Sequence, residues 1–173
     1  MERHVECLTQ QQVRHGHRVT MVFRHGAAVP NGATRLPLQR SVRSRMLAPV
    51  SDRIAFAEEA AAAIRGLCAD SSRHGVDLVH LHGDHVEAAR LGPACRHLGI
   101  PLFLTVHAAL TDRHQWLARH AFRHVEAFIA LGSATAAGLV ARSVDQRHIL
   151  TMSSGLELSA MPPPTPAHRV SVA

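Results

Sequence analysis

Histidines and an aspartate gather in one short stretch of the chain, residues 76–90, which reads VDLVHLHGDHVEAAR. Its centre has the order H-x-H-x-D-H and consists of His80, His82, Asp84 and His85. Imidazole nitrogens and carboxylate oxygens are ordinary zinc ligands, and a zinc-bound water is a hydrolytic nucleophile near neutral pH. The stretch therefore raises one chemical hypothesis, a zinc hydrolase that uses these four residues.

The order of these residues resembles the zinc motif of metallo-β-lactamase-like hydrolases, but the surrounding sequence departs from that family. A Gly-Gly pair is missing after His85, where Val86 and Glu87 stand, and no GHTPG-like stretch follows to supply a further ligand. The rest of the chain is too helical in pattern for a two-sheet sandwich. With 15 histidines in the chain, such a spelling also arises easily by chance. We therefore expect no metal, and the zinc hydrolase is the least favoured function.

The composition is that of one globular domain. The chain has 173 residues, 46% of them hydrophobic and 3% aromatic, enough to bury roughly two-thirds of the unfolded surface. No apolar run reaches the ~18 residues that a membrane-spanning helix needs, and the start MERHVE lacks the apolar stretch of a secretory signal. Cys7, Cys68 and Cys95 lie far apart with no C-x-x-C pair, which favours reduced thiols. These features predict a cytoplasmic protein.

The positive charge of the chain comes from arginine alone. All 19 basic residues are arginine and the formal net charge is +6. Because aromatic residues for base stacking are not interleaved with them, we expect no nucleic-acid partner. The densest cluster is Arg40, Arg43 and Arg45, in a segment punctuated by prolines. It is either a solvated loop or a contact with an anionic surface, which would place the protein peripherally at the inner face of the membrane.

Apolar segments of strand length alternate with helical segments along the chain. The first helix is expected over residues 2–15, with Gly16 as its stop, and a strand follows at 17–23. After a Pro- and Arg-rich loop, Ser51 is expected to cap a long helix over residues 52–75. Further strands are expected at 76–82, 100–107, 127–132 and 148–154. The helices between them are expected at about 85–98, where Gly92-Pro93 starts or kinks the helix, at 112–125, and at 133–143, where Ser133 is the cap.

This alternation predicts an α/β fold with a doubly wound, Rossmann-like parallel sheet that helices cover on both faces. In such sheets ligands bind at the carboxyl ends of the strands. His80 and His82 lie at the carboxyl end of one expected strand, and His107 lies at the end of the next. The fold therefore predicts that these histidines lie at the carboxyl ends of strands, where ligands bind.

Read in order, five segments resemble the amino-terminal domain of family 4 (group 1) glycosyltransferases of the GT-B type. They are ERHVECLTQQQVRHGHRVTMV, VDLVHLHG, GIPLFLTVHAAL, FIALGSATAAGLV and HILTMSSGLEL. The similarity covers about residues 2–158. It implies a retaining, hexosyltransferase-like enzyme in carbohydrate biosynthesis that moves a sugar from a nucleotide-sugar co-substrate, without a cofactor, to a carbohydrate, lipid or small-molecule acceptor held by this domain.

The resemblance also implies site residues. His107 matches the histidine of the T-x-H motif that faces the donor sugar, and is the catalytic candidate. His82 and Gly83 match the crevice segment, and Asp84 either accepts a hydrogen bond from an acceptor hydroxyl or caps a helix. Ser133 matches the S-x-x-T helix start, where it is a cap first and a ligand second. Ser154 and Gly155 stand where an Asn-Gly pair is usual.

The ends of the chain depart from the family pattern. The chain begins at the family's first helix, so we expect residues 1–158 to form a domain without its first strand and glycine loop. We expect residues 159–173 to be a Pro-rich linker, since they contain the run MPPPTPAHRVSVA. This linker would lead to a donor domain that holds the nucleotide-sugar. The isolated fragment is accordingly expected to be poorly soluble or molten and inactive. The alternative function is a non-catalytic module that binds a sugar or an acceptor.

Overall fold

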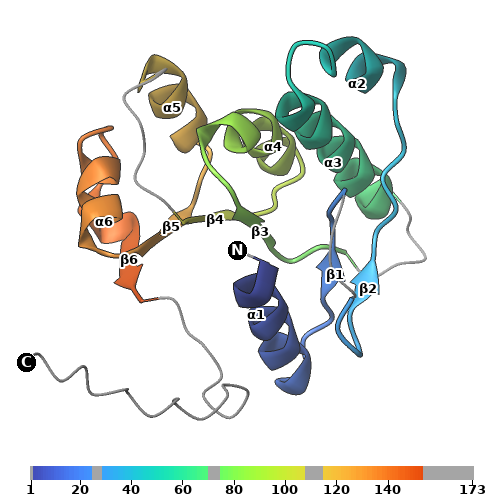
Figure 1. Ribbon diagram of the computed structural model, residues 1–173, viewed down its shortest axis with the longest axis horizontal. Coiled ribbons are helices and arrows are strands. Elements are labelled where there is room, and N and C mark those ends of the chain that lie inside the picture. The colour runs from blue at the N-terminus through green and yellow to red at the C-terminus, as the bar shows by residue number, and fades with distance from the viewer. Residues whose placement is uncertain (1, 25–28, 70–74, 108–114, 154–173) are drawn as a thin grey trace, which may run out of the picture.

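The computed structural model describes residues 2–24, 29–69, 75–107 and 115–153. Its centre is a parallel sheet in the order β3-β4-β5-β6 (Figure 1). The four strands are β3 (Val79–His82), β4 (Leu102–Val106), β5 (Ala127–Leu131) and β6 (Ile149–Met152). A second, two-stranded parallel sheet pairs β1 (Thr20–Met21) with β2 (Thr34–Arg35). The α/β class with parallel sheets is therefore as predicted.

Helices lie on both sides of the larger sheet (Figure 1). They are α1 (Glu2–Arg14), α2 (Val42–Leu47), α3 (Asp52–Ala69), α4 (His85–His97), α5 (Gln115–Phe122), α6 (Ser133–Val140) and the short 3-10 helix η1 (Gln146–His148). Helices α4 and α5 pack on one face of the sheet, and α1 lies on the other side, below β3 in the view of Figure 1. In the larger sheet, β3, β4 and β5 are each followed in the chain by a helix before the next strand, as a parallel order requires.

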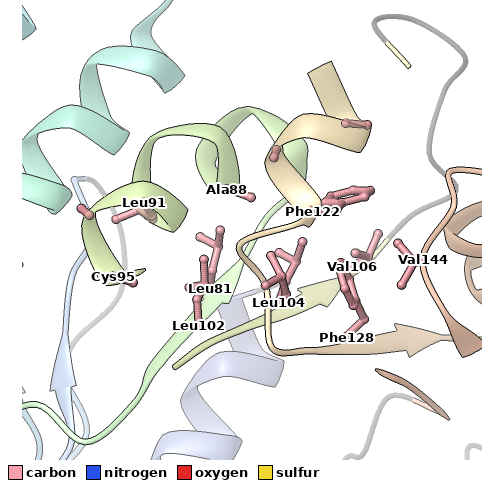
Figure 2. Close-up of a cluster of buried hydrophobic side chains, with 14 of the residues drawn as sticks. Leu81, Ala88, Leu91, Cys95, Leu102, Leu104, Val106, Phe122, Phe128 and Val144 are labelled. Atoms are coloured by element: carbon pink, nitrogen blue, oxygen red, sulfur yellow. The ribbon is translucent and has the colours of Figure 1, made fainter. Parts of the chain in front are cut away.

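The core lies between the sheet and α4 and α5 (Figure 2). Alternate residues of β4, such as Leu102 and Leu104, point toward these helices and are buried, as is Phe128 of β5. Leu91 of α4 and Phe122 of α5 meet them from above. Burying each large apolar side chain contributes roughly 1.5–3 kcal/mol, so this layer holds the strand ends in fixed positions.

The amino-terminal part of the chain contains more structure than the sequence pattern predicted. The strand expected over residues 17–23 is shorter, and the segment expected to be a loop contains β2 and α2. Thr34 donates its backbone N–H to Val19 O at 2.9 Å, and Leu36 donates to Met21 O at 2.9 Å. Ser41 caps α2, since its Oγ accepts from Ser44 N at 3.0 Å. Short elements of this kind have too few residues to show a periodicity.

Three of the predicted helix ends can be compared with the structure. Gly16 ends α1 as expected, with a φ of +84° and hydrogen bonds from Gly16 N to Val13 O and from His17 N to Gln12 O. Ser51 caps α3 as expected, accepting from Ile54 N at 3.4 Å.

The expectation that Ser133 caps α6 is wrong. Gly132 holds the N-cap position with a φ of 104°, without a side-chain hydrogen bond, and Ser133 is the first helical residue. The reason is that β5 turns into α6 through a single residue with a backbone conformation that favours glycine.

Helix α4 shows why Gly92 precedes Pro93 inside a helix. The helix runs from His85 to His97 with Pro93 inside it, close to the predicted range of 85–98, so the alternative that Gly92-Pro93 starts the helix is wrong. A Cβ on Gly92 would lie 2.6 Å from the Cβ of His124, so the glycine permits the close approach of the segment after α5.

We expect Gly92→Ala to destabilise the fold by about 1–3 kcal/mol, because the added methyl group overlaps a Cβ that cannot swing away. The matched control is Gly66→Ala in α3, where an added Cβ meets no atom within 4 Å. That change should be neutral or stabilise by up to ~1 kcal/mol through helix propensity. Urea denaturation of both variants measures the difference, and equal midpoints would contradict the packing argument.

The edge of β3 that faces away from β4 has no strand partner among the described residues. Strand β1 pairs with β2 and not with β3. A parallel order with one further strand between β1 and β3 would join the two sheets. Of the predicted helix 52–75, α3 is described as far as Ala69, residues 70–74 lie outside the described residues, and Gly75 is not helical. The boundary predicted at residue 158 also lies outside the described residues.

Candidate functional site

Histidine side chains from two neighbouring strands meet at the carboxyl edge of the sheet. The register aligns His82, the last residue of β3, with Thr105 of β4, and His107 directly follows β4. The Nδ1 of His82 and the Nε2 of His107 lie 3.0 Å apart and share a hydrogen bond. Because parallel strands end at the same edge, residues 25 positions apart in sequence form one pair.

His80 extends this pair along β3. It lies two residues before His82 and therefore on the same face of the strand, and the two ring centroids are 4.3 Å apart. Its Nε2 lies 2.7 Å from the Oγ1 of Thr105, which is itself almost fully buried. His80 is thus held in place by a side chain of the neighbouring strand β4.

A fourth histidine, His4, comes from α1 and was not singled out in the sequence. Its ring contacts His82 and His107 edge-on, with centroid separations of 5.9 and 5.5 Å. The only signal was the ERHV spelling of the first helix, which says nothing about the direction in which the histidine points. We call His4, His80, His82 and His107 the histidine cluster.

The surroundings of the cluster favour neutral imidazoles. The pKa of His82 is lowered to about 3, first by burial and then by the neighbouring charges of His80, His107 and His4. Burial and His4 also lower the pKa of His80 and of His107. Two neutral imidazoles joined by one hydrogen bond have complementary tautomers, because one ring donates and the other accepts. The cluster can therefore donate or accept hydrogen bonds but is a weak base.

An ion-pair clamp fixes the turn that follows His82. Asp84 caps α4, accepting from Val86 N at 2.8 Å, and Glu87 completes a capping box by accepting from Asp84 N at 3.2 Å. Arg53, at the start of α3, donates to both Glu87 oxygens at 2.6 and 2.7 Å and lies 2.8 Å from Asp84 Oδ1. The clamp also keeps the pKa of Asp84 below its usual value, against the effect of burial.

Gly83 links the strand to this clamp. Its N–H donates to Thr105 O at 3.2 Å, which continues the pairing of β3 with β4 for one residue beyond the strand. A Cβ at this position would lie 3.0 Å from Glu87 Oε2. The glycine thus leaves room for the capping box, and the turn holds His82 against His107.

The sequence of the chain matches a known protein family. Residues 1–160 match the sequence model of Glycosyltransferase Family 4. The chain belongs to glycosyltransferase family 4. The expected family is thereby confirmed, and with it the fold as the amino-terminal, Rossmann-like half of a GT-B protein.

Solved structures resemble this family 4 domain only distantly. Anabaena Alr3699/HepE in complex with UDP is 14% identical, with a TM-score of 0.49 over 76% of this chain and 32% of that protein. The structure of its complex with UDP-glucose is 13% identical, with a TM-score of 0.48 over 74% of this chain and 32% of that protein. The UDP-GlcNAc 2-epimerase from Neisseria meningitidis bound to UDP-GlcNAc is 14% identical, with a TM-score of 0.44 over 70% of this chain and 38% of that protein. The chain thus spans about a third of the length of these proteins, and no curated protein matches it significantly.

The residues of the zinc hypothesis separate in the family 4 domain. His80 and His82 belong to the histidine cluster, whereas His85 is buried in the first turn of α4 and Asp84 serves as its cap. Within the residues that the structure describes, no group of three or more His, Cys, Asp or Glu side chains is arranged to hold a metal ion.

The other predicted site residues take different positions. Ser133 is exposed where β5 ends, at the same edge of the sheet as the cluster. Arg40, Arg43 and Arg45 are exposed around α2. Ser154 and Gly155 lie outside the described residues. In the described ranges, no helix is both long and apolar enough to cross a bilayer.

Acid should destabilise the family 4 domain through its histidine cluster. The pKa of His82 is about 3 when folded, against about 6.5 when unfolded. Its contribution is therefore complete above about pH 6.5 and is lost as the pH falls toward 3. At about pH 5 the loss for His82 alone is roughly 2 kcal/mol.

Thermal midpoints at about pH 7.5 and pH 5 measure this effect. The control is His82→Gln, which removes the titrating group and should flatten the dependence. An equally steep dependence in both proteins would assign the acid sensitivity to other groups.

Proposed function

We propose that this chain is the acceptor-side half of a retaining glycosyltransferase, and that its histidine cluster faces the transferred sugar. Family membership supports the transferase class, and the position of the cluster at the carboxyl edge of the parallel sheet supports the site. The single observation that carries the proposal is the contact of His107 with His82 at 3.0 Å. It brings the two histidines that match the family's motifs into one place.

The chemistry proposed for His107 is hydrogen bonding rather than proton abstraction. In the transfer, the bond from the anomeric carbon to the diphosphate oxygen breaks, a bond to the acceptor oxygen forms, and the proton of the acceptor hydroxyl passes to the departing nucleoside diphosphate. A histidine whose pKa is lowered is a poor base for that proton. A neutral imidazole can instead bind a hydroxyl of the sugar and stabilise it as charge develops at the anomeric carbon.

The remaining residues have supporting roles in this proposal. His82 orients His107 through the shared hydrogen bond. Gly83 lets the turn after β3 pass close to the Glu87 carboxylate of the capping box. Asp84 acts through structure, because its carboxylate is engaged by Val86 N and by Arg53. Ser133, exposed at the end of β5, is available to a ligand at this edge of the sheet.

The donor would be a nucleotide-sugar held by a carboxyl-terminal domain. The test joins the chain to such a domain from a family 4 enzyme and measures nucleoside diphosphate release from a panel of nucleotide-sugars. Release that depends on an added acceptor supports the transferase. Nucleotide-sugar binding without release, in a fusion with both halves folded, would favour the non-catalytic binding module.

A further inference from the structure

The strongest feature outside the histidine cluster is an apolar stripe on α2 and the turn that follows it. Val42, Met46 and Val50 are 72%, 74% and 77% exposed. Three large apolar residues at a spacing of four are otherwise typical of a buried helix face. Here they lie on the outer surface, since α2 sits at the margin of the molecule beyond α3 (Figure 1).

The geometry of α2 explains why the stripe faces outward. At about 100° per residue, Met46 lies about 40° around the helix from Val42, whereas Ser44 lies about 200° away. Ser44 is 1% exposed and therefore faces the protein. The stripe thus lies opposite the buried side of α2. No rearrangement of the helix on α3 is needed to present it.

Arginines flank the stripe on both sides. By the same rotation, Arg43 lies about 100° to one side of Val42 and Arg45 about 60° to the other. Arg40 is also exposed, just before the helix. Arg43 lies 3.7 Å from Glu58, and its side chain remains 67% exposed. The sequence between Glu6 and Asp52 contains no acidic residue, so nothing in that segment offsets the arginines.

We propose that α2 is a membrane-docking element that inserts Val42, Met46 and Val50 into an anionic bilayer. Apolar residues flanked by arginines match the two parts of such a surface, acyl chains below and anionic headgroups above. Charge complementarity selects an anionic bilayer over a neutral one. The inference goes beyond the proposed transferase activity and does not depend on it.

The docking element is connected to the histidine cluster through a short path. Residue Val50 is followed by Ser51, the cap of α3, and Arg53 in the first turn of α3 binds Asp84 and Glu87. Asp84 in turn lies two residues beyond His82. A bilayer bound at α2 would therefore hold the cluster edge of the sheet near its surface.

The test is co-sedimentation of the full chain with two kinds of vesicle, phosphatidylcholine alone and phosphatidylcholine mixed with phosphatidylglycerol. Binding is expected to the mixed vesicles and to weaken steeply with salt. Replacing Arg40, Arg43 and Arg45 with Ser should weaken it about 100-fold. The triple variant Val42→Ser, Met46→Ser, Val50→Ser should weaken it at least ~10-fold.

Matched control variants separate docking through α2 from non-specific binding of the protein to vesicles. Val140→Ser, Leu150→Ser and Met152→Ser remove three exposed apolar residues elsewhere, and Arg119→Ser, Arg123→Ser and Arg147→Ser remove the same charge elsewhere. Both controls should bind like the parent chain. Insertion is measured by tryptophan fluorescence in the double variant Trp116→Phe, Met46→Trp, whose only tryptophan is at position 46. Its fluorescence emission should shift to shorter wavelength with mixed vesicles and not with phosphatidylcholine alone.

Three results would overturn the proposal. One is the absence of binding to mixed vesicles. Another is an equal loss of binding in the control variants. The third is self-association in solution that the Val42, Met46 and Val50 substitutions abolish without any effect of lipid, which would assign the stripe to a second copy of the chain.

Discussion

A strand joined in front of α1 by a Gly-Gly loop should raise the stability of residues 1–173 by about 4 kcal/mol. The edge of β3 that faces away from β4, which has no strand partner among the described residues, presents roughly two N–H and two C=O groups, since alternate residues of a strand point each way. Each hydrogen bond contributes about 1 kcal/mol net. Against a typical net stability of about 5–15 kcal/mol, this is a large change. The strand would also join β1 and β2 to the main sheet.

Urea denaturation and hydrogen exchange measure this effect together. The added strand should raise the midpoint, make the transition steeper and protect the amides of β3. The matched control has the same composition, with a proline placed in the middle of the added strand so that it cannot complete the ladder. If both additions shift the midpoint equally, the edge of β3 is not where the strand binds.

The larger sheet was predictable from the sequence because its strands are short apolar runs, and β4 is the run that is most completely buried. Runs such as the one around Leu102 and Leu104 are apolar on consecutive residues, which is typical of a parallel strand covered on both faces. The alternation of these runs with helices also predicted that the strands run parallel, as the structure has them. The same pattern placed His82 and His107 at one edge of the sheet, where the structure also has them.

The parts that the sequence did not predict depend on contacts between distant residues. His4 contacts His82 and His107 because α1 lies beneath β3, which no local sequence pattern indicates. Arg53 reads as one more exposed arginine of a helix start, yet it holds Glu87, 34 positions away. Asp84 had two open interpretations, and the capping box with Glu87 is now the observed one. Ser133 was misplaced by one residue because a glycine conformation outweighed a favourable cap residue.

In a fusion with a nucleotide-binding domain, His107→Ala should lower kcat/KM for sugar transfer about 10- to 100-fold while the fold stays intact. The basis is the loss of one hydrogen bond to a group that is charged or polar in the transition state, worth about 1.5–3 kcal/mol. The fall should appear in kcat more than in KM if the bond strengthens in the transition state. His107→Gln, which keeps a donor and an acceptor, should recover part of the rate.

Two further variants separate a role in transfer from a role in folding. His97→Ala removes an exposed histidine at the far end of α4 and should leave transfer unchanged. His82→Ala should lower transfer less than His107→Ala, because His82 acts by orienting its neighbour through the 3.0 Å contact. The double variant should then be no slower than His107→Ala alone, since the orienting residue has nothing left to orient. Additive losses would mean that the two histidines contact the substrate independently, and unimpaired transfer by His107→Ala would remove it from the site.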